Sequence, residues 1–252
     1  MGLAGRVALV TGGGRGIGRA IALALAEDGA DVAVNYARDE AAAMATVAAI
    51  EALGRRARAY GARVEDGDAA ARMVDAVVAE FGFVDILVNN AGIASRGRSV
   101  ATTDPAELER VVRIHALAPH RLCQLVLPSM QTRPRGDIVM ISSIATLHHP
   151  ANGAPYNMGK AAMEALALTL SKEVKERGIR VNIVAPGLVE TEMGRRLVKA
   201  TAGVEDIRKL DAAMPFGRVC QPEDVANAVR WLVSDGASYV TGEKINVYGG
   251  GT

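Results

Sequence analysis

A serine, a tyrosine and a lysine follow one another at spacings that suit acid–base chemistry. Ser143 precedes Tyr156 by thirteen residues, and Lys160 follows Tyr156 by four. A free tyrosine titrates near pH 10, so its catalytic use requires a nearby cation that stabilises its anion. Residues four apart on a helix project from one face, so Lys160 can supply that cation. Ser143 closes an apolar, strand-like run and can present its hydroxyl to a carbonyl oxygen.

The composition gives no reason to expect a nucleic acid or a membrane as a partner. The 252 residues include 29 Lys and Arg against 28 Asp and Glu, a net charge of +1, which does not attract a polyanion. No apolar stretch approaches the roughly 18 to 20 residues that cross a bilayer. Cys123 and Cys220 lack metal-ligand spacing, and no signal-like segment opens the chain. We expect a cytoplasmic protein with one domain over residues 1–252 and small-molecule partners.

Short β-branched apolar runs alternate with longer alanine-rich helical patterns. The alternation predicts an α/β fold, a Rossmann-like doubly wound sheet of seven parallel strands with helices on both faces. The predicted strands are VALVT, DVAVNY, ARAY, VDILVNN, DIVMIS, IRVNIVAP and KINVY, and the predicted helices span residues 16–28, 40–53, 67–81, 105–131, 155–177 and 222–234. Weak periodicity over residues 190–215 favours either a mobile insertion over the site or an ordinary pair of surface helices.

The first predicted strand runs into the glycine-rich turn TGGGRGIG, which an alanine-rich helix follows. Gly12, Gly16 and Gly18 have the spacing G-x-x-x-G-x-G, and glycine permits a tight turn and close approach of a phosphate. The unpaired N–H groups that open a helix attract a pyrophosphate, so a nucleotide cofactor is reasonable here. A P-loop is disfavoured because Arg19 and Ala20 stand where Lys and Ser or Thr belong.

Four motifs in this order resemble the classical short-chain dehydrogenases/reductases: TGGGRGIG, NNAG at 89–92, Ser143 with Tyr156 and Lys160, and APG followed by Thr191. Together they override the ordinary interpretation of Tyr156 and Lys160 as solvated surface residues. The resemblance spans essentially the whole chain and is strongest to the 3-oxoacyl-[acyl-carrier-protein] reductases. It implies hydride transfer between a nicotinamide and a carbonyl or carbinol carbon. Tyr156 would exchange the proton, Lys160 would lower its pKa and bind ribose hydroxyls, and Ser143 would hydrogen-bond the reacting oxygen.

The resemblance also implies which residues contact the cofactor. Besides Tyr156 and Lys160 they are Gly12, Arg15, Gly16, Ile17, Gly18, Asn35, Arg38, Arg63, Val64, Asn90, Ala91, Gly92, Pro186, Gly187, Val189 and Thr191. Thr191 would reach the nicotinamide carboxamide, and a plain strand-to-helix turn is the alternative for this last segment. Asn89 is expected to pin neighbouring strands instead of binding the cofactor.

The end of the second predicted strand favours NADP(H) over NAD(H). Sites for NAD place an Asp or Glu there to accept the ribose 2′-hydroxyl, but this chain has NYAR at 35–38. Arg15 and Arg38 could hold a 2′-phosphate through charge-assisted contacts. The alternative is that Arg38 points into solvent beside Asp39 and Glu40, which would begin the next helix.

Three positions depart from the family pattern. His115 replaces an Asn that usually supports a water-mediated proton relay. A histidine could hold the same water, repel Lys160 when protonated, or only pack within its helix. Arg63 replaces an Asp that usually touches the adenine, and it either faces solvent or strengthens phosphate binding. Tyr248 replaces an Asp far in sequence from the chemistry. These departures raise a second hypothesis, a nucleotide-binding regulatory protein without turnover.

The resemblance makes a 3-oxoacyl thioester the leading substrate, with a small ketone or sugar-like alcohol as the alternative. An acyl carrier protein as partner would require a basic surface near the site entrance. The candidates for that surface are Arg133, Arg135 and Arg177. His148 and His149 either line the entrance or are exposed, and without two further ligands they do not indicate a metal. The resemblance also implies that the two long helices, 105–131 and 155–177, pack against a second subunit in a homotetramer, whereas their composition alone shows only apolar faces.

Overall fold

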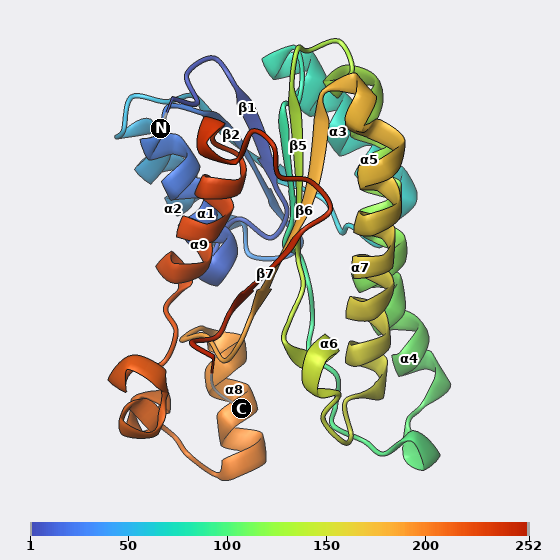
Figure 1. Ribbon diagram of the computed structural model, residues 1–252, viewed down its shortest axis with the longest axis vertical. Coiled ribbons are helices and arrows are strands. Elements are labelled where there is room, and N and C mark those ends of the chain that lie inside the picture. Colours follow the sequence, from blue (N-terminus) through green and yellow to red (C-terminus); the bar gives the residue numbers. More distant parts are fainter. Residues whose placement is uncertain (1, 251–252) are drawn as a thin grey trace.

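Seven strands form one parallel sheet in the computed structural model, which describes residues 2–250 (Figure 1). The strands are β1 (Val7–Val10), β2 (Asp31–Tyr36), β3 (Ala57–Gly61), β4 (Ile86–Asn89), β5 (Gly136–Ile141), β6 (Ile179–Pro186) and β7 (Lys244–Val247). Their order across the sheet is β3-β2-β1-β4-β5-β6-β7, and each neighbouring pair is parallel. The predicted doubly wound, Rossmann-like sheet is therefore confirmed.

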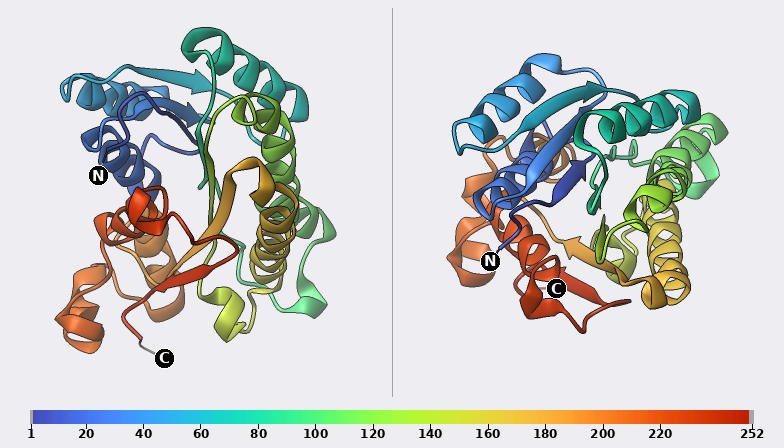
Figure 2. Two further views of the ribbon diagram at one scale, coloured as in Figure 1. Left: turned by 45° about the horizontal axis from the view of Figure 1, so that its top comes forward. Right: turned by 90° about the horizontal axis from the view of Figure 1, so that it is seen from above.

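Helices cover both faces of this sheet (Figures 1 and 2). They are α1 (Gly16–Glu27), α2 (Glu40–Glu51), α3 (Gly67–Phe81), α4 (Pro105–Val112), α5 (Ala118–Met130), α6 (Ala145–His148), α7 (Ala154–Val174), α8 (Glu192–Ala202) and α9 (Pro222–Leu232). Helices α1, α2 and α9 pack on one face through Ile21, Ile50 and Val229. Helices α3, α5 and α7 pack on the other through Val77, Leu122 and Met163. The continuous apolar strands are thus buried on both sides.

The helix predicted over residues 105–131 is interrupted. Helix α4 ends at Val112, a π-helical segment η2 (Arg113–Leu117) follows, and α5 continues the same path. Pro119 has no N–H to donate to a carbonyl of the preceding turn, which accounts for the local widening. Such π-helical turns are frequent at functional sites, and this one carries His115.

Residues 190–215 form ordered elements instead of a featureless loop. Helix α8 is followed by the 3₁₀ segments η4 (Ile207–Ala213) and η5 (Pro215–Gly217), with a small core of their own. The Glu190 carboxylate accepts hydrogen bonds from Arg195 at 3.3 Å and from Arg208 at 3.2 Å, which ties α8 to η4. The arrangement agrees with the alternative of surface helices.

The carboxyl ends of the strands meet at one edge because all strands run in the same direction. The glycine turn follows β1, the NNAG segment ends β4, Ser143 follows β5, and the APG segment ends β6. These four motifs are far apart in the sequence. The sheet brings them to one edge, where ligands bind in folds of this kind.

Candidate active site

The end of β5 and the first two turns of α7 bring Ser143, Tyr156 and Lys160 together. Burial raises the pKa of the half-buried Tyr156, and a hydrogen bond from the Ser143 side chain lowers it. The Lys160 Nζ lies 5.7 Å from the centroid of the Tyr156 ring and donates to the carbonyl of Ile141 at 2.6 Å. The sequence prediction that these three side chains share one site therefore agrees with the geometry.

Lys160 has an unusual environment for a lysine, since only 3% of its surface is exposed. Burial lowers the pKa of its amine to about 7, and the charge of Glu164, four residues later on α7, raises it. An ammonium with a pKa in this range gains or loses its proton around neutrality. The charge on Lys160 is therefore sensitive to its immediate neighbours.

The imidazole of His115 fills the space between two glycines beside Tyr156. A Cβ added at Gly92 would lie 2.6 Å from the His115 Cε1, and one added at Gly159 would lie 2.9 Å from the His115 Cβ. The ring meets the Tyr156 ring edge-on, with centroids 5.1 Å apart. The π-helical segment thus places the buried His115 ring against the Tyr156 ring.

His115 is neutral at physiological pH. Burial and the charge of Lys160 lower its pKa to about 3, although a hydrogen bond with Ile93 raises it. Its Nε2 lies 2.8 Å from the Ile93 carbonyl oxygen and 3.2 Å from the Ile93 backbone nitrogen, and the shorter contact, with the oxygen, favours a proton on Nε2. Its Nδ1 is buried and has no hydrogen-bond partner among residues 2–250, so it is available as an acceptor. A protonated imidazole that repels Lys160 is not what the structure supports.

We expect the buried His115 to weaken the fold in acid. Its pKa is near 6.5 in the unfolded chain and about 3 in the folded protein, so the unfolded state binds more protons between these values. Stability is fully present above pH 6.5 and falls as the pH decreases towards 3. Between pH 7 and pH 4.5 the loss due to His115 should be about 2 to 3 kcal/mol.

Urea denaturation at both pH values measures this loss. His115→Asn should show a smaller decrease of the unfolding free energy than the wild type, whatever its absolute stability. His120→Asn is the matched control, because His120 is exposed on α5 and should leave the decrease unchanged. Equal decreases in wild type and His115→Asn would contradict the buried neutral imidazole.

The glycine turn fits a phosphate-bearing cofactor. Helix α1 begins at Gly16 without a side-chain cap, and its first turn contains no acidic residue, so its N–H groups remain available to an anion. Gly12 and Gly16 have φ values of 62° and 53°, which favour glycine. A Cβ at Gly18 would lie 2.2 Å from the Gly12 carbonyl oxygen, and Ile17 packs against the core beneath the turn.

Two asparagines hold this turn in place. The Asn35 side chain is 1% exposed, accepts from the Gly12 N–H at 3.3 Å and donates to the Ala62 carbonyl at 2.9 Å. It therefore supports the glycine turn from within the protein, and its predicted contact with the cofactor stays a prediction. Asn90 Nδ2 donates to the Thr11 carbonyl at 2.8 Å, so the turn is also fixed to the NNAG segment.

The remainder of the NNAG segment is anchored from the same side. The N–H of Ala91 donates to the Thr11 hydroxyl at 2.9 Å, and Gly92 lies against His115. Asn89 is buried, but its Oδ1 has no partner among residues 2–250, and its Nδ2 approaches only the Cys123 sulfur at 3.8 Å. Among residues 2–250 the Asn89 side chain therefore makes no hydrogen bond to a neighbouring strand, although its backbone pairs with Met140 of β5.

The predicted phosphate-binding arginines differ in their surroundings. Arg15 forms an ion pair of 2.7 Å with Glu192, the first residue of α8, and both side chains are largely exposed. Arg38 is exposed just past β2, and no ion pair to it occurs within residues 2–250. Asp39 caps α2 by accepting from the Ala42 N–H, so the acidic residues after Arg38 do begin a helix.

The adenine side of the predicted site contains Arg63 and Val64. The Arg63 guanidinium binds Glu65 at 2.7 Å and is half exposed, whereas Val64 is buried in the core under α3. Arg63 therefore faces solvent with its charge already paired. This agrees with the first of the two alternatives for Arg63.

The segment after β6 is held against β7 and α8. Pro186 ends β6, and the Gly187 N–H donates to the Val247 carbonyl at 2.9 Å. Val189 is buried and pairs with Cys220 in an isolated parallel bridge. The Thr191 hydroxyl accepts from the Gly194 N–H at 3.0 Å and so caps α8. These contacts make the segment a fixed wall.

Tyr248 lies against the same wall. A Cβ at Gly187 would come within 2.8 Å of the Tyr248 Cβ, and the Tyr248 ring lies 6.2 Å from the ring of His148, centroid to centroid. His148 and His149 are exposed at the end of α6. Tyr248 thus connects β7 to the loop between Ser143 and Tyr156, a position that its distance in sequence concealed.

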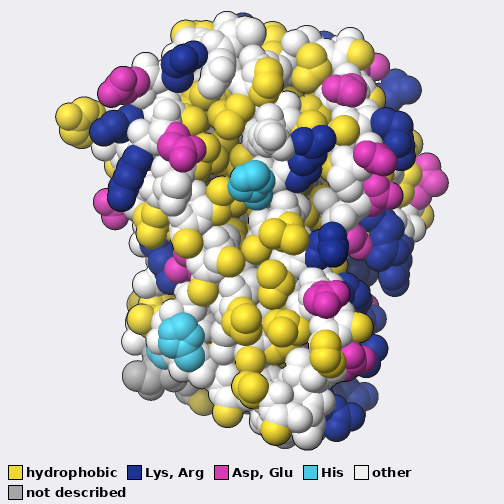
Figure 3. Space-filling view, turned by 90° about the vertical axis from the view of Figure 1, so that its right-hand side faces the viewer, with side chains coloured by type: hydrophobic (Ala, Val, Ile, Leu, Met, Phe, Trp, Pro, Cys, Tyr) yellow, Lys and Arg dark blue, Asp and Glu magenta, His cyan; other side chains and the backbone are white. Residues whose placement is uncertain are grey.

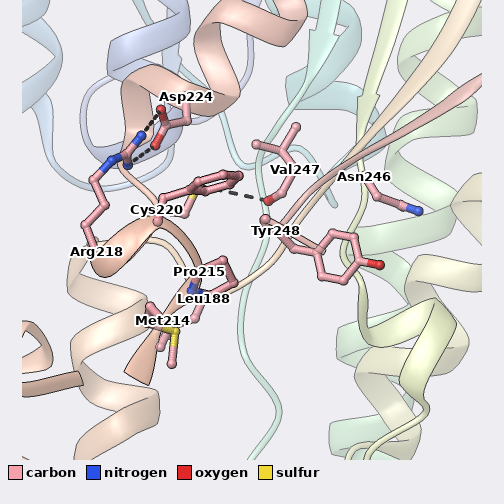
Figure 4. Close-up of a pocket in the computed structure, with 11 residues that line it drawn as sticks. Leu188, Met214, Pro215, Arg218, Cys220, Asp224, Asn246, Val247 and Tyr248 are labelled. Carbon is pink, nitrogen blue, oxygen red and sulfur yellow. Dashed lines mark hydrogen bonds and ion pairs between the residues drawn. The ribbon is translucent and has the colours of Figure 1, made fainter. Parts of the chain in front are cut away.

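A cavity of about 290 Å³ adjoins this wall (Figure 4). It is lined by Leu188, Met214, Pro215, Phe216, Arg218, Cys220, Asp224, Asn246, Val247, Tyr248 and Gly249. Most of the lining comes from the segment after α8 and from the end of β7. None of the lining residues belongs to the Ser143, Tyr156 and Lys160 group, so the cavity lies beside the acid–base site and not at it.

The three arginines predicted to flank the site entrance lie at the opposite edge of the sheet. Arg133 and Arg135 precede β5, and Arg177 precedes β6, so all three stand at amino ends of strands. Arg133 binds Asp85 at 2.9 Å, and Arg135 binds Asp137 at 3.1 Å. The prediction was therefore wrong for a single chain. Arg133 and Arg135 pair with carboxylates that are buried where the strands begin, at the edge of the sheet opposite the site.

Three residues near the site were missed in the sequence. Glu164 accepts a hydrogen bond from Ser142, the residue after β5. Lys244 binds Glu164 at 2.9 Å, and Glu192 pairs with Arg15. Glu164 lies four residues after Lys160, the same helical spacing that identified the Tyr156 and Lys160 pair. This spacing could have identified Glu164 from the sequence. Lys244 and Glu192 carry no comparable local signal, because strand pairing and α8 bring them near.

Residues 2–250 contain neither a membrane-spanning helix nor a cluster of metal ligands. No helix in this part of the chain is both long and apolar enough to cross a membrane. No group of three or more His, Cys, Asp or Glu side chains there could hold a metal ion. Cys123 and Cys220 are both free thiols.

Known proteins are similar to this chain in fold and in sequence. The profile of the family described as Enoyl-(Acyl carrier protein) reductase matches residues 12–252. The 3-oxoacyl-[acyl-carrier-protein] reductase of Staphylococcus epidermidis is 38% identical over 96% of this chain and 97% of its own length. A short chain dehydrogenase from Burkholderia cenocepacia in complex with NADP is 36% identical over 98% of each chain, with a TM-score of 0.88. NAD+-bound xylitol dehydrogenase is 31% identical over 98% of this chain and 99% of its own, with a TM-score of 0.91.

Sequence, fold and site agree on one family. The matched residues include the glycine turn, the NNAG segment and the Ser143, Tyr156 and Lys160 group. The similarity extends over nearly the full length of the relatives and not over one motif alone. The chain therefore belongs to the short-chain dehydrogenase/reductase family of oxidoreductases.

Proposed function

We propose that the protein is an NADP(H)-dependent oxidoreductase that interconverts a carbonyl group and a secondary alcohol, with a 3-oxoacyl thioester as its leading substrate. The observation that carries this proposal is the convergence of Ser143, Tyr156 and Lys160 at the carboxyl edge of the sheet, beside the uncapped start of α1. An acid–base group and a phosphate-binding turn at one edge are the two parts that nicotinamide chemistry requires.

The residues divide the reaction between them. The nicotinamide, when bound, supplies or accepts the hydride at the carbon atom. In the reductive direction Tyr156 gives its phenolic proton to the carbonyl oxygen, which becomes the hydroxyl of the product. Ser143 donates a hydrogen bond to that oxygen as negative charge develops. Lys160, as an ammonium, stabilises the tyrosine anion that remains.

His115 completes the proposed site as a neutral hydrogen-bonding group. Its Nε2 is engaged with Ile93, and its buried Nδ1 has no protein partner among residues 2–250. A lone pair at Nδ1 can accept a hydrogen bond from water. We assign His115 the role of holding a water molecule through which Tyr156 is reprotonated, in place of the Asn expected from the family.

Substrate choice rests on the relatives. The Staphylococcus epidermidis relative is named for 3-oxoacyl-[acyl-carrier-protein] reduction, which supports an acyl thioester and an acyl carrier protein as partner. The similarity to xylitol dehydrogenase supports the alternative, a small ketone or sugar-like alcohol. The positions of Arg133 and Arg135 give no basic surface at the entrance of a single chain, so a carrier protein would bind elsewhere or across subunits.

A substrate panel tests the proposal. Purified protein is mixed with NADPH and with 3-oxoacyl thioesters, enoyl thioesters, small ketones and ketoses, and the loss of nicotinamide absorbance is followed. Turnover of 3-oxoacyl thioesters supports the leading assignment, and preferential turnover of ketones or ketoses supports the alternative. NADPH binding without turnover across the panel would overturn the enzyme assignment in favour of a nucleotide-binding regulatory protein.

The preference for NADP(H) leads to a prediction about Arg15, Arg38 and Glu192. The Arg15 and Arg38 side chains are exposed near the end of β2, where a 2′-phosphate would be bound. Removing both guanidinium groups should weaken NADPH binding by about 30-fold and leave NADH binding nearly unchanged. Glu192→Gln should strengthen NADPH binding about threefold, because Arg15 no longer has to leave an ion pair.

Titration of nicotinamide fluorescence measures both dissociation constants. Arg177→Ala is the matched control, since Arg177 is an exposed arginine at the opposite edge of the sheet. An unchanged ratio of NADPH to NADH affinity in Arg15→Ala/Arg38→Ala would overturn the cofactor assignment.

Assembly into a homotetramer is part of the proposal. Figure 3 shows hydrophobic side chains gathered on the face formed by α4, α5 and α7. Exposed apolar residues here include Leu117, on η2 between α4 and α5, and Met158 and Leu168 on α7. An apolar face of this kind favours association, and the two long helix paths are those expected to meet a second subunit. Sedimentation of the purified protein measures the number of copies.

A further inference from the structure

The carboxylate of Glu164 lies at the centre of a hydrogen-bonded group behind the acid–base site. Its Oε1 accepts from the Ser142 hydroxyl at 2.5 Å and from the Thr146 hydroxyl at 2.7 Å. The Lys244 Nζ lies 2.9 Å from Oε1 and 3.0 Å from Oε2, and it also donates to the Thr146 hydroxyl at 2.7 Å. Glu164 and Lys244 are largely buried, with 16% and 26% of their side chains exposed.

The hydrogen bonds of Glu164 reach both halves of the site. Ser142 immediately precedes Ser143, and Thr146 follows Ser143 by three residues, so the loop that presents the Ser143 hydroxyl is attached on both sides. On α7, Tyr156, Lys160 and Glu164 follow at intervals of four, so they share one face of the helix. Glu164 therefore joins the loop of one reacting group to the helix of the other two.

Burial lowers the pKa of Lys160, and the charge of Glu164, one helical turn later on α7, raises it. The other charged or titratable groups that face Lys160 are the phenol of Tyr156 on α7 and the neutral imidazole of His115 on η2. The charged group that contacts Glu164 from another element is Lys244 on β7. An anion placed one turn from a buried ammonium favours its protonated form, and a second ammonium on that anion reduces the effect.

We propose that Glu164 is a positioning residue that keeps Lys160 in its ammonium form and holds the Ser143 loop in register with Tyr156. Lys244 partly offsets the negative charge of Glu164. The assignment of Lys160 to catalysis rests on the proposed function. The electrostatic relation between the three residues does not, and it can be measured without any substrate. The two claims can therefore fail separately.

The experiment titrates Lys160 by NMR in the full-length protein labelled with ¹³C and ¹⁵N lysine, where loss of one signal in Lys160→Met identifies the resonance. In Glu164→Gln the pKa of Lys160 should fall by about one unit, because the nearby anion is removed. In Lys244→Met it should rise by about half a unit, because Glu164 loses its competing cation. A residue with a merely structural role would not produce shifts of opposite sign.

Matched variants separate charge from packing. Glu173→Gln removes an exposed carboxylate from the same helix and should leave the Lys160 titration unchanged. Ser142→Ala removes a hydrogen bond but no charge, and it should also leave the Lys160 pKa in place. Unchanged Lys160 titration in both Glu164→Gln and Lys244→Met, or shifts in the same direction, would overturn the proposal. Lys244→Met alone decides the matter if Glu164→Gln does not fold.

The substrate reaction gives a second readout once the panel has identified a substrate. The alkaline limb of kcat/KM should move to lower pH in Glu164→Gln and to higher pH in Lys244→Met, since Lys160 loses its proton earlier or later. If NMR shows the opposite shifts but the alkaline limb does not follow, the electrostatic role stands and the catalytic assignment of Lys160 fails.

Discussion

Tyr156→Phe is expected to lower kcat/KM by about 1,000-fold for any carbonyl substrate, because it removes the proton donor and little else. The phenylalanine ring retains the edge-on contact with His115, whose ring centroid lies 5.1 Å away. Burial raises the pKa of the Tyr156 hydroxyl and Ser143 lowers it, so the group remains a protonated donor near neutrality. The dissociation constant for NADPH should change by less than about threefold.

Steady-state kinetics and a separate binding titration distinguish the two effects. Tyr239→Phe is the matched control, because Tyr239 is fully exposed and the same atom is deleted there. A variant of Tyr156 that keeps more than a tenth of the activity would show that another group supplies the proton. A variant that loses NADPH binding in parallel would show that the ring, and not the hydroxyl, is what matters.

The fold could be predicted where the physical cause is local. Residues 138–141 of β5 are buried and all apolar, and such an apolar run is distinctive in a sequence. The interruption at residues 113–117 could not be predicted from periodicity, which continues across it. Its cause lies in Pro119, and the effect of that proline depends on α5 continuing the path of α4.

The site residues also divide into those that local geometry could predict and those that depend on distant parts of the chain. Tyr156 and Lys160 could be predicted to be neighbours because helix geometry alone places them together. Asn35 was assigned to the cofactor, but its amide partners come from the end of β3 and the residue after it, and a sequence does not show which carbonyls a neighbouring strand offers. Arg135 was assigned to the entrance, although its position before β5 already indicated the opposite edge of the sheet.

Lys160→Met should lower kcat/KM by at least about 100-fold and at the same time stabilise the protein. Burial lowers the pKa of Lys160 to about 7 from its ordinary value of 10.5, so the folded protein carries a costly buried ammonium below pH 7. As the pH rises from 7 to 10.5, the unfolded chain keeps a proton that the folded chain has lost, and the cost disappears. At pH 6 the variant should gain about 2 kcal/mol, after subtracting the hydrogen bond to Ile141.

Chemical denaturation at pH 6 and pH 9 separates a catalytic lysine from a structural one. The gain should be present at pH 6 and nearly absent at pH 9, while Lys172→Met, at an exposed position on the same helix, should show neither the gain nor the loss of activity. A structural lysine would lose stability when replaced, because its hydrogen bond would outweigh its buried charge. If Lys160→Met loses activity but gains stability, Lys160 serves the reaction at a cost to the stability of the fold. If the variant loses both activity and stability, this catalytic role of Lys160 is contradicted.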